Sequence, residues 1–517
     1  MIPEFRNEPF TDFSQAGNKE VLKNAIAKVR AELGKKYPLV INGEYIETSD
    51  LLTSTNPGKP KEIIGTFSKA DKELAEKAMQ AALNAFESWK HVCPMERARY
   101  LLKAAAIMRR KKVELTAWLI LEIGKSHAEA DGDVAEAIDF LEFYGREMIR
   151  LGGPQPVVPY PGEENELYYV ALGVGLIVPP WNFPLAILVG MTSAAIVAGN
   201  TVLLKPSSET PAIAYQFVKI MEEAGLPKGV LNFVPGPGAS VGDMLVAHAK
   251  TRFIAFTGSK EVGLRINEMA AKTQKGQLWI KRVIAEMGGK DSIVVDKDAD
   301  LELAAEGITA SAFGFQGQKC SACSRAIIHK DVYDEVLAKV VERTKKLTIG
   351  TPEDPANYFG PVSSKSAYES ILEYIEIGKK EGKLECGGKK IDTADGGFYI
   401  EPTIFSGIDP MARISQEEIF GPVLAFIKAD SFDDALKIAN NTEFGLTGAV
   451  YSRNRSLLEK ARREFYCGNL YINRKCTGAL VGVHPFGGFN MSGTDSKAGG
   501  RDYLLLFTQA KSVSEKF

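Results

Sequence analysis

A cysteine in a glycine-rich segment is the first residue that could do chemistry. Cys320 lies in the segment GFQGQKCSACSR at residues 314–325. A cysteine in a folded chain is most often a small buried hydrophobic residue. Here the two glycines and two glutamines before it favour an irregular loop that another group can approach closely. We therefore predict that the thiol of Cys320 acts as a nucleophile.

Glu286 is the carboxylate whose surroundings best suit proton transfer. It follows the apolar run Arg282–Ala285 and precedes two glycines. Desolvation at the end of an apolar strand should raise the pKa of its carboxyl group toward that of a useful general base. A salt bridge with Lys281 or Lys290 would account for the same residue equally well.

Asn182 is a candidate donor to a developing oxyanion. It lies in the segment PPWNFP at residues 179–184, where prolines on both sides restrict the backbone. A rigidly held amide N–H is a suitable oxyanion donor. An ordinary turn asparagine is the alternative.

Cys323 forms a C-x-x-C pattern with Cys320, which could be redox active or half of a metal site. The chain has neither a second C-x-x-C nor a local pair of histidines, so zinc is not expected. A thioredoxin-like role would need the pattern at the start of a helix in a small domain. We predict no metal site.

Two segments that follow apolar strands could contact a nucleotide. Gly236–Gly242 has G-x-G-x-x-x-G spacing, one residue longer than the dinucleotide fingerprint, so it is a weak signal by itself. Lys205, after another strand, could meet a ribose or a phosphate, or could be a solvated loop charge.

Short apolar strands alternate with helices from Gly173 to Glu286, which predicts βαβ units and a parallel sheet. Ligands of such sheets bind at the carboxyl ends of the strands, where the Pro-, Gly- and Ser-rich turns lie. This arrangement predicts a dinucleotide-binding domain of the Rossmann type. The expected strands are Gly175–Val178, Val202–Leu204, Leu231–Val234 and Phe253–Phe256.

A second α/β run begins at Asp291, with helices expected near 301–315, 331–347 and 365–381. Its expected strands include Arg325–His329, Phe398–Ile400 and Leu424–Ile427. We expect three parts. Residues 1–150 and 173–287 form the dinucleotide-binding domain, residues 288–478 the catalytic domain, and residues 151–172 and 495–517 a protruding β segment for self-association.

The N-terminal part is expected to be mainly helical. Asn42-Gly43 between two apolar runs predicts a β-hairpin, and residues 71–89, 95–111 and 113 onward predict helices. The first 35 or so residues look like a helical arm. Its apolar face would carry Val21, Ala25, Ile26, Val29 and Leu33.

The overall composition is that of an ordinary globular protein, with 45% hydrophobic and 25% charged residues among 517. The net charge of -2 gives no reason to expect a nucleic-acid or anionic-membrane partner. Six cysteines in so long a chain are no disulfide scaffold, and the N-terminus resembles neither a signal nor a transit peptide. We expect a cytoplasmic protein.

One uncharged stretch, Leu167–Leu204, is long enough to suggest a membrane span. However, Gly199-Asn200 stands where a helix would stop, and the β-rich run Thr201–Leu204 follows. We interpret the stretch as a fully buried helix followed by a buried strand.

Several short motifs, taken in order, resemble the motif series of the aldehyde dehydrogenase superfamily. The resemblance covers roughly residues 35–515. The motifs are PWNFP at 180–184, KPS at 205–207, FTGS at 256–259, EMGGK at 286–290, GQKC at 317–320, EEIFGPV at 417–423, PFGG at 485–488 and SG at 492–493.

The resemblance implies a role for each candidate. Cys320 would form a thiohemiacetal that loses a hydride to nicotinamide, and Glu286 would activate water to hydrolyse the resulting thioester. Asn182 and the backbone N–H of Cys320 would hold the oxyanion. The cofactor positions would be Val178, Trp181, Lys205, Ser207, Ser208, Gly238, Gly258, Ser259, Glu418 and Phe420.

Ser208 departs from a common family pattern. Many NAD-specific members carry a glutamate there, which grips the adenosine 2′-hydroxyl. A serine would not repel a 2′-phosphate, so the resemblance implies NAD with NADP also possible, although Glu209 could compensate.

Local details are similar to the branch that oxidises L-glutamate γ-semialdehyde to L-glutamate in proline breakdown. They lie in segments 317–325 and 477–482. In that branch Ser321 and the loop at Gly478-Ala479 would bind the α-carboxylate, and backbone N–H groups of such a loop can form an anion nest.

The same resemblance implies that Phe183 and Phe486 sandwich the aliphatic chain and that Glu136 faces the α-amino group, unless Glu136 is a solvated helix charge. Another ω-semialdehyde, such as succinate semialdehyde, is an alternative substrate. A cofactor-independent thiol esterase and a non-enzymatic binding protein are alternatives of other classes.

Overall fold

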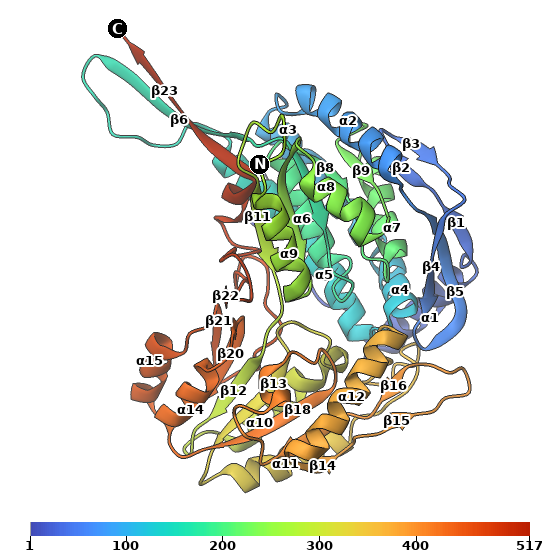
Figure 1. Cartoon of the computed structure of the whole chain (residues 1–517), viewed down its shortest axis with the longest axis vertical. Coiled ribbons are helices and arrows are strands. Elements are labelled where there is room, and N and C mark those ends of the chain that lie inside the picture. Colours follow the sequence, from blue (N-terminus) through green and yellow to red (C-terminus); the bar gives the residue numbers. More distant parts are fainter. Residues whose placement is uncertain (1) are drawn as a thin grey trace.

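Two seven-stranded sheets form the framework of the chain, one above the other in Figure 1. The computed structural model describes residues 2–517. The upper sheet is built from β2 (Leu39–Ile41), β3 (Glu44–Ile46), β7 (Val174–Val178), β8 (Thr201–Leu204), β9 (Leu231–Phe233), β10 (Thr251–Thr257) and β11 (Arg282–Glu286). Their order across the sheet is β11-β10-β7-β8-β9-β2-β3.

Strands β7 to β11 of the upper sheet run parallel, as predicted. The segments that follow Val178, Leu204, Phe233, Thr257 and Glu286 therefore begin at one edge. The hairpin of β2 and β3 lies beside β9, at the end of the strand order opposite to β11. Its turn residues Asn42 and Gly43 both adopt left-handed φ angles, of 53° and 72°.

Helices cover both faces of this sheet. Neighbouring residues Leu176 and Ile177 of β7 belong to different apolar cores, because successive side chains of a strand point to opposite faces. This two-sided burial explains why the strands read as uninterrupted apolar runs. The helices of the upper half are α2 (Lys72–Trp89), α3 (Pro94–Arg110), α4 (Lys112–Ile123), α5 (His127–Leu151), α6 (Ala186–Val197), α7 (Pro211–Glu223), η1 (Gly238–Gly242), α8 (Asp243–Ala247) and α9 (Lys260–Ala271).

Helix α6 accounts for the uncharged stretch. Apart from Ile187, every residue of it is buried, and β8 follows it directly, as predicted. Within residues 2–517, no helix combines the length and apolar character that a membrane crossing would need.

The lower sheet forms the second α/β unit, also as predicted. Its order is β14-β17-β18-β13-β12-β20-β21. These strands are β12 (Asp291–Val295), β13 (Cys323–His329), β14 (Lys383–Cys386), β17 (Thr403–Ser406), β18 (Val423–Ala429), β20 (Thr447–Tyr451) and β21 (Asn469–Ile472). The helices here are α10 (Leu301–Phe313), η2 (Gly314–Gly317), α11 (Tyr333–Lys345), α12 (Lys365–Glu381), α13 (Arg413–Gln416), α14 (Phe432–Asn440) and α15 (Arg455–Glu464).

The N-terminal region differs from the predicted helical arm. Helix α1 (Ala16–Arg30) buries Leu22 rather than Val21, which is 55% exposed, so that part of the predicted apolar face was wrong. Residues 2–12 form no regular element. A small sheet of β1 (Lys35–Tyr37), β4 (Leu51–Asn56) and β5 (Lys59–Ser68) follows, which the sequence patterns did not indicate.

A two-stranded ribbon projects from the upper half (Figure 1). Strand β6 (Glu163–Ala171) pairs antiparallel with β23 (Thr508–Lys516), at the end of the chain. The predicted strand character of both segments is confirmed. The remaining elements are β15 (Lys390–Ile391), β16 (Tyr399–Ile400), β19 (Phe444–Gly445), β22 (Phe489–Asn490) and η3 (Tyr503–Phe507).

Candidate active site

One cavity of about 550 Å³ brings the two principal candidates together. Cys320 and Glu286, which are far apart in the sequence, both line it. The walls come from α5, from the segment after β7 and from the loops that precede β13 and follow β21. All the expected substrate-binding residues also line it, namely Glu136, Phe183, Ser321, Gly478, Ala479 and Phe486.

Cys320 sits on an irregular loop between η2 and β13. Phe315 and Gln316 adopt left-handed φ angles of 48° and 57°, which are uncommon for residues with side chains. A Cβ atom on Gly317 would collide with the carbonyl of Gly421, so this position needs a glycine. The composition of the segment thus follows from its close packing and sharp turns.

The surroundings of Cys320 disfavour its thiolate form. Burial raises its pKa well above the ordinary value, and the negative charges of Asp291, Glu418 and Glu286 add to that effect. Nucleophilic attack therefore requires that a neighbouring group or a bound ligand favour the thiolate.

Glu286 ends strand β11 with its carboxyl group in the cavity. Burial raises its pKa to about 8. One oxygen accepts a hydrogen bond from the Ser496 hydroxyl, and the other is buried with no partner in the described part of the chain. Lys281 instead donates to the Val246 carbonyl, at 2.7 Å, and the Nζ of Lys290 is buried without a partner.

The salt-bridge alternative for Glu286 is therefore wrong: neither lysine pairs with it. A carboxyl group with one free oxygen and a pKa near neutrality suits proton transfer at physiological pH.

Asn182 joins the segment after β7 to the cysteine loop. Its Nδ2 donates to the carbonyl of Gln318, two residues before Cys320, at 3.0 Å, and the residue is only 4% exposed. The amide is thus tied to the loop that carries Cys320, although Asn182 is not among the residues that line the cavity. Its other N–H makes no hydrogen bond within residues 2–517.

Phe183, which lines the cavity, packs against a buried ion pair. Lys125 and Asp133 lie 2.7 Å apart with both side chains fully buried. The ammonium of Lys125 lies over the ring of Phe183, 3.9 Å from its centroid, and Asp133 accepts the N–H of Ala186 at the start of α6. The sequence analysis missed this pair, because nothing local in the sequence indicates that the two side chains meet.

Glu136 projects from α5 into the same cavity. Burial, reinforced by the charge of Asp133, raises its pKa to about 8. The carboxyl group has no hydrogen bond or ion pair with any other described residue. This position does not fit the alternative of a solvated helix charge.

The loop after β21 lines the same cavity as Glu136. Gly478 has a φ angle of 78°, which favours glycine. Arg474 donates to the carbonyls of Thr477 and Gly478, and its guanidinium lies over Tyr471, 4.4 Å from the ring centroid. Arg474 was also missed from the sequence.

The cofactor candidates gather at the carboxyl edge of the upper sheet. Val178, Ser207, Ser208, Gly238 and Gly258 lie at or just after the ends of β7, β8, β9 and β10. Trp181 and Phe420 form an edge-to-face pair, 5.3 Å apart, and Glu418 accepts the N–H of Gly289 at 2.9 Å. Ser259 caps helix α9 by accepting the N–H of Val262.

The surroundings of Lys205 indicate whether a nucleotide would fit at the carboxyl edge of the upper sheet. It is 7% exposed and has no hydrogen bond or ion pair within residues 2–517. Its side chain runs beside Gly242, where an added Cβ would lie 3.4 Å from Cε. A buried, unpaired ammonium at the carboxyl edge of a parallel sheet suits the hydroxyl or phosphate groups of a dinucleotide.

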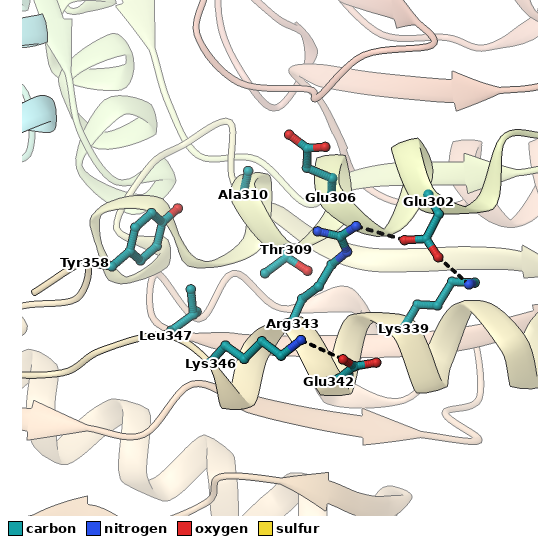
Figure 2. Close-up of a pocket in the computed structure, with 10 residues that line it drawn as sticks. All are labelled: Glu302, Glu306, Thr309, Ala310, Lys339, Glu342, Arg343, Lys346, Leu347 and Tyr358. Atoms are coloured by element: carbon teal, nitrogen blue, oxygen red, sulfur yellow. Dashed lines mark hydrogen bonds and ion pairs between the residues drawn. The ribbon is translucent and has the colours of Figure 1, made fainter. Parts of the chain in front are cut away.

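A second hollow of about 530 Å³ lies between α10 and α11 and is shown in Figure 2. Glu302 pairs with Lys339 and Arg343, and Glu342 pairs with Lys346. Its cations are therefore satisfied by neighbouring carboxylates. It offers no unpaired cation and no nucleophile.

Comparisons with known proteins show which family the chain resembles throughout its length. The model of the aldehyde dehydrogenase family matches residues 45–513. The chain is 62% identical to 1-pyrroline-5-carboxylate dehydrogenase of Geobacillus thermodenitrificans and 60% identical to that of Bacillus subtilis, in both cases over all of either chain. A crystal structure of 1-pyrroline-5-carboxylate dehydrogenase from Thermus with bound NAD is similar over all of both chains, with a TM-score of 0.98 and 51% identity.

Proposed function

The chain belongs to the aldehyde dehydrogenase family, and on that premise we propose that it uses NAD to oxidise L-glutamate γ-semialdehyde to L-glutamate. The semialdehyde is the open form of 1-pyrroline-5-carboxylate, which appears in the names of the relatives. The observation that carries the proposal is the single cavity that holds a thiol, a buried base, an unpaired carboxyl group and a glycine loop. These groups match an aldehyde at one end of a substrate and an amino acid head group at the other.

The residues of the chain divide the reaction into two steps. The thiol of Cys320 releases its proton to water, and its sulfur bonds to the aldehyde carbon. The amide of Asn182 and the backbone N–H of Cys320 hold the resulting oxyanion. NAD, when bound, supplies the hydride acceptor that converts this adduct into a thioester on Cys320. Glu286 then takes a proton from water as the water oxygen attacks the thioester, which releases the acid and returns the thiol.

The remaining groups of the cavity recognise the rest of the substrate. Glu136 would pair with the α-ammonium group, which is why its carboxyl group has no partner in the protein. The hydroxyl of Ser321 and the backbone of Gly478-Ala479 would hold the α-carboxylate. Phe183 and Phe486 would enclose the aliphatic chain.

The substrate is tested by comparing aldehydes. We expect purified enzyme to form NADH with pyrroline-5-carboxylate at a higher kcat/KM than with succinate semialdehyde or propanal. Equal or better turnover of either of these two would overturn the assignment. Ester cleavage without NAD as the only activity would support the esterase alternative.

The carboxylate-binding loop is tested by a matched pair of variants. Gly478→Leu should raise KM for glutamate semialdehyde while leaving propanal almost unaffected, because only the amino acid reaches the loop. Gly396→Leu is the control, since Gly396 has a similar φ angle of 71° but nothing lies within 4 Å of an added Cβ. Equal effects of the two variants would contradict the role of the loop.

Cofactor choice is tested separately. We propose NAD, with Lys205, Glu418 and the Trp181–Phe420 pair among the groups that contact it. Ser208 is exposed and carries no charge, so it presents no barrier to a 2′-phosphate. A kcat/KM with NADP that equals that with NAD would overturn the preference.

We further infer that copies of this chain associate through the β6–β23 ribbon. A two-stranded ribbon has unpaired edges and is marginally stable alone, so it gains from a partner. Light scattering should find an oligomer, and removing residues 508–517 should reduce its size. A monomer at assay concentration would contradict the inference.

We propose that the two sheets belong to domains with different functions. Residues 1–150 and 173–287 would bind the dinucleotide, residues 288–478 would supply the thiol, and residues 151–172 and 495–517 would mediate self-association. The gap between β11, which ends at Glu286, and β12, which begins at Asp291, supports this boundary. All six cysteines are free thiols, which supports a reducing, cytoplasmic setting.

A further inference from the structure

Residues 2–13 form no helix or strand, and we call them the strap. The strap contacts helix α5 on one side and Val481, in the loop after β21, on the other. A chain segment outside helices and strands must find partners for its backbone groups elsewhere. Several partners of the strap lie on helix α5 and on the loop after β21, which both line the substrate cavity. This placement distinguishes it from an ordinary free terminus.

Two carboxylates of α5 anchor the strap. Asp139 accepts the backbone N–H of Glu8 at 2.7 Å, and Asp131 accepts both the backbone N–H and the hydroxyl of Thr11, at 2.8 and 2.6 Å. Lys112 donates to the carbonyl of Pro9 at 2.7 Å. Hydrogen bonds to charged groups are stronger than those between neutral groups, so the strap is held in one position.

Asn7 links two elements that line the cavity. Its Nδ2 donates to the carboxylate of Asp139 on α5 at 2.8 Å and to the carbonyl of Val481 at 3.0 Å. Val481 lies two residues after Ala479, and both residues line the cavity together with Glu136. One amide group therefore ties the loop proposed to hold the α-carboxylate to the helix that carries Glu136.

Phe10 and Thr11 of the strap also line the cavity itself. Phe10 is 64% exposed, so it stands at the rim, where the cavity meets solvent. Further along, the ring of Phe5 packs edge-on against Phe143 of α5, with centroids 5.2 Å apart. The strap thus contributes Phe10 to the rim of the cavity and is held against α5 by Phe5.

We propose that this strap determines substrate specificity, by fixing the distance between Glu136 and the Gly478-Ala479 loop and by forming one side of the cavity opening at Phe10. The inference rests on the proposed function, because it concerns how the amino acid end of that substrate is held. The strap also precedes residue 45, where the match to the general family model begins, whereas the matches to the named relatives extend over it. A branch-specific element is the expected place for a branch-specific preference.

The test removes the link at Asn7 in the full-length enzyme. Asn7→Ala should raise KM for glutamate semialdehyde about tenfold, since two hydrogen bonds that position the loop are lost, and should leave kcat within about twofold. The KM and kcat for propanal should both stay within about twofold, because propanal has no amino acid group. Asn7→Asp should also raise KM for glutamate semialdehyde. Aspartate has the same size as asparagine, but it has no N–H donor and is repelled by the negative charge of Asp139.

Arg6→Ala is the matched control. Arg6 lies on the same segment, is exposed, and has no hydrogen bond or ion pair in the described chain, so its kinetics should equal those of the unaltered enzyme. Phe10→Ala is a second variant that does not endanger folding, because its ring is largely exposed. It should reduce the ratio of kcat/KM for the semialdehyde to that for longer unbranched aldehydes such as hexanal.

The outcomes separate the two proposals. An unaltered enzyme that does not prefer the semialdehyde defeats the proposed function. If that preference holds but neither Asn7→Ala nor Phe10→Ala changes it, or if Asn7→Ala impairs propanal as much as the semialdehyde, the strap is only a structural brace and the inference is overturned.

Discussion

Two hollows of almost equal size, about 550 and 530 Å³, differ in the state of their charged groups. In the hollow between α10 and α11 each cation is paired with a carboxylate and reaches solvent; the side chains of Lys339 and Glu302 are 26% and 61% exposed. In the active-site cavity, Glu286 and Glu136 are carboxyl groups with raised pKa values. One oxygen of Glu286 is buried without a partner, and Glu136 has no hydrogen bond or ion pair within residues 2–517.

The difference shows why size alone does not identify a site. Burying an ionisable group without a partner costs stability, so such a group persists where it acts on something outside the protein. Exposed ion pairs cost little and contribute little. The following changes, from the largest expected effect to the smallest, test this contrast.

Cys320→Ala should have the largest effect, since it removes the atom that bonds to the substrate. Turnover should fall by at least about a thousandfold, while NAD still binds because the alanine leaves the strand-end loops intact. NADH absorbance and fluorescence titration of NAD measure the two properties. Cys93→Ala, at an exposed thiol outside the cavity, should have normal activity, and near-normal turnover of Cys320→Ala would refute the nucleophile assignment.

Glu286→Gln should slow turnover by about a hundredfold to a thousandfold, because the amide cannot take a proton from water. In the unaltered enzyme the rate should rise with pH through about 8, where the carboxyl group ionises. A burst of NADH followed by slow turnover would show that thioester hydrolysis has become limiting. The absence of any change in the pH profile would contradict the role of Glu286 as base.

The same variant should change stability with a definite sign. The pKa of Glu286 in the folded chain, about 8, lies above its ordinary value of 4.5, so the folded state holds a proton that the unfolded state releases. Stability from this group therefore falls as pH rises from 4.5 to about 8. Glu286→Gln should raise the melting temperature more at pH 9 than at pH 4, and a larger gain at the lower pH would contradict the burial of this carboxyl group.

Glu136→Gln should have a more selective effect. Loss of the carboxylate removes the expected partner of the α-ammonium group, so KM for glutamate semialdehyde should rise by about tenfold to a hundredfold. Propanal, which has no amino group, serves as the internal control and should be oxidised as before. A similar loss with both aldehydes would indicate damage to the cavity rather than lost recognition.

Changes in the paired hollow should have the smallest effect. Glu302→Gln and Arg343→Ala each break exposed ion pairs between α10 and α11. We expect kcat/KM to stay within about twofold and the melting temperature to change little. A strong loss of activity in either variant would show that this hollow takes part in function after all.

Local patterns in the sequence predicted much of the framework. The alternation of apolar strands and helices indicated the parallel sheet, and Asn42-Gly43 indicated its hairpin. Some short strands were missed, such as β17 with four residues, because so short a run shows no periodicity of its own. The face of α1 was misjudged between Val21 and Leu22 because adjacent apolar residues fit either side of a helical stripe.

The sequence also indicated which residue types could do the chemistry, but not what surrounds them. The partner of Glu286 proved to be Ser496, which lies 210 residues away, and not either nearby lysine. Lys125 and Arg474 support the cavity walls without any local signal. Such partners are brought together only when distant elements pack.

The sequence by itself determined the element types, the order of the chemical motifs and the presence of a thiol and a carboxylate suited to act together. These depend on local periodicity and on side-chain chemistry, which neighbouring residues encode. The tertiary structure alone decided that Cys320, Glu286 and Glu136 share one cavity and that the strap reaches across 132 residues, from Asn7 to Asp139. Burial, charge pairing and pKa depend on which elements pack against one another, and no local stretch of the sequence specifies that packing.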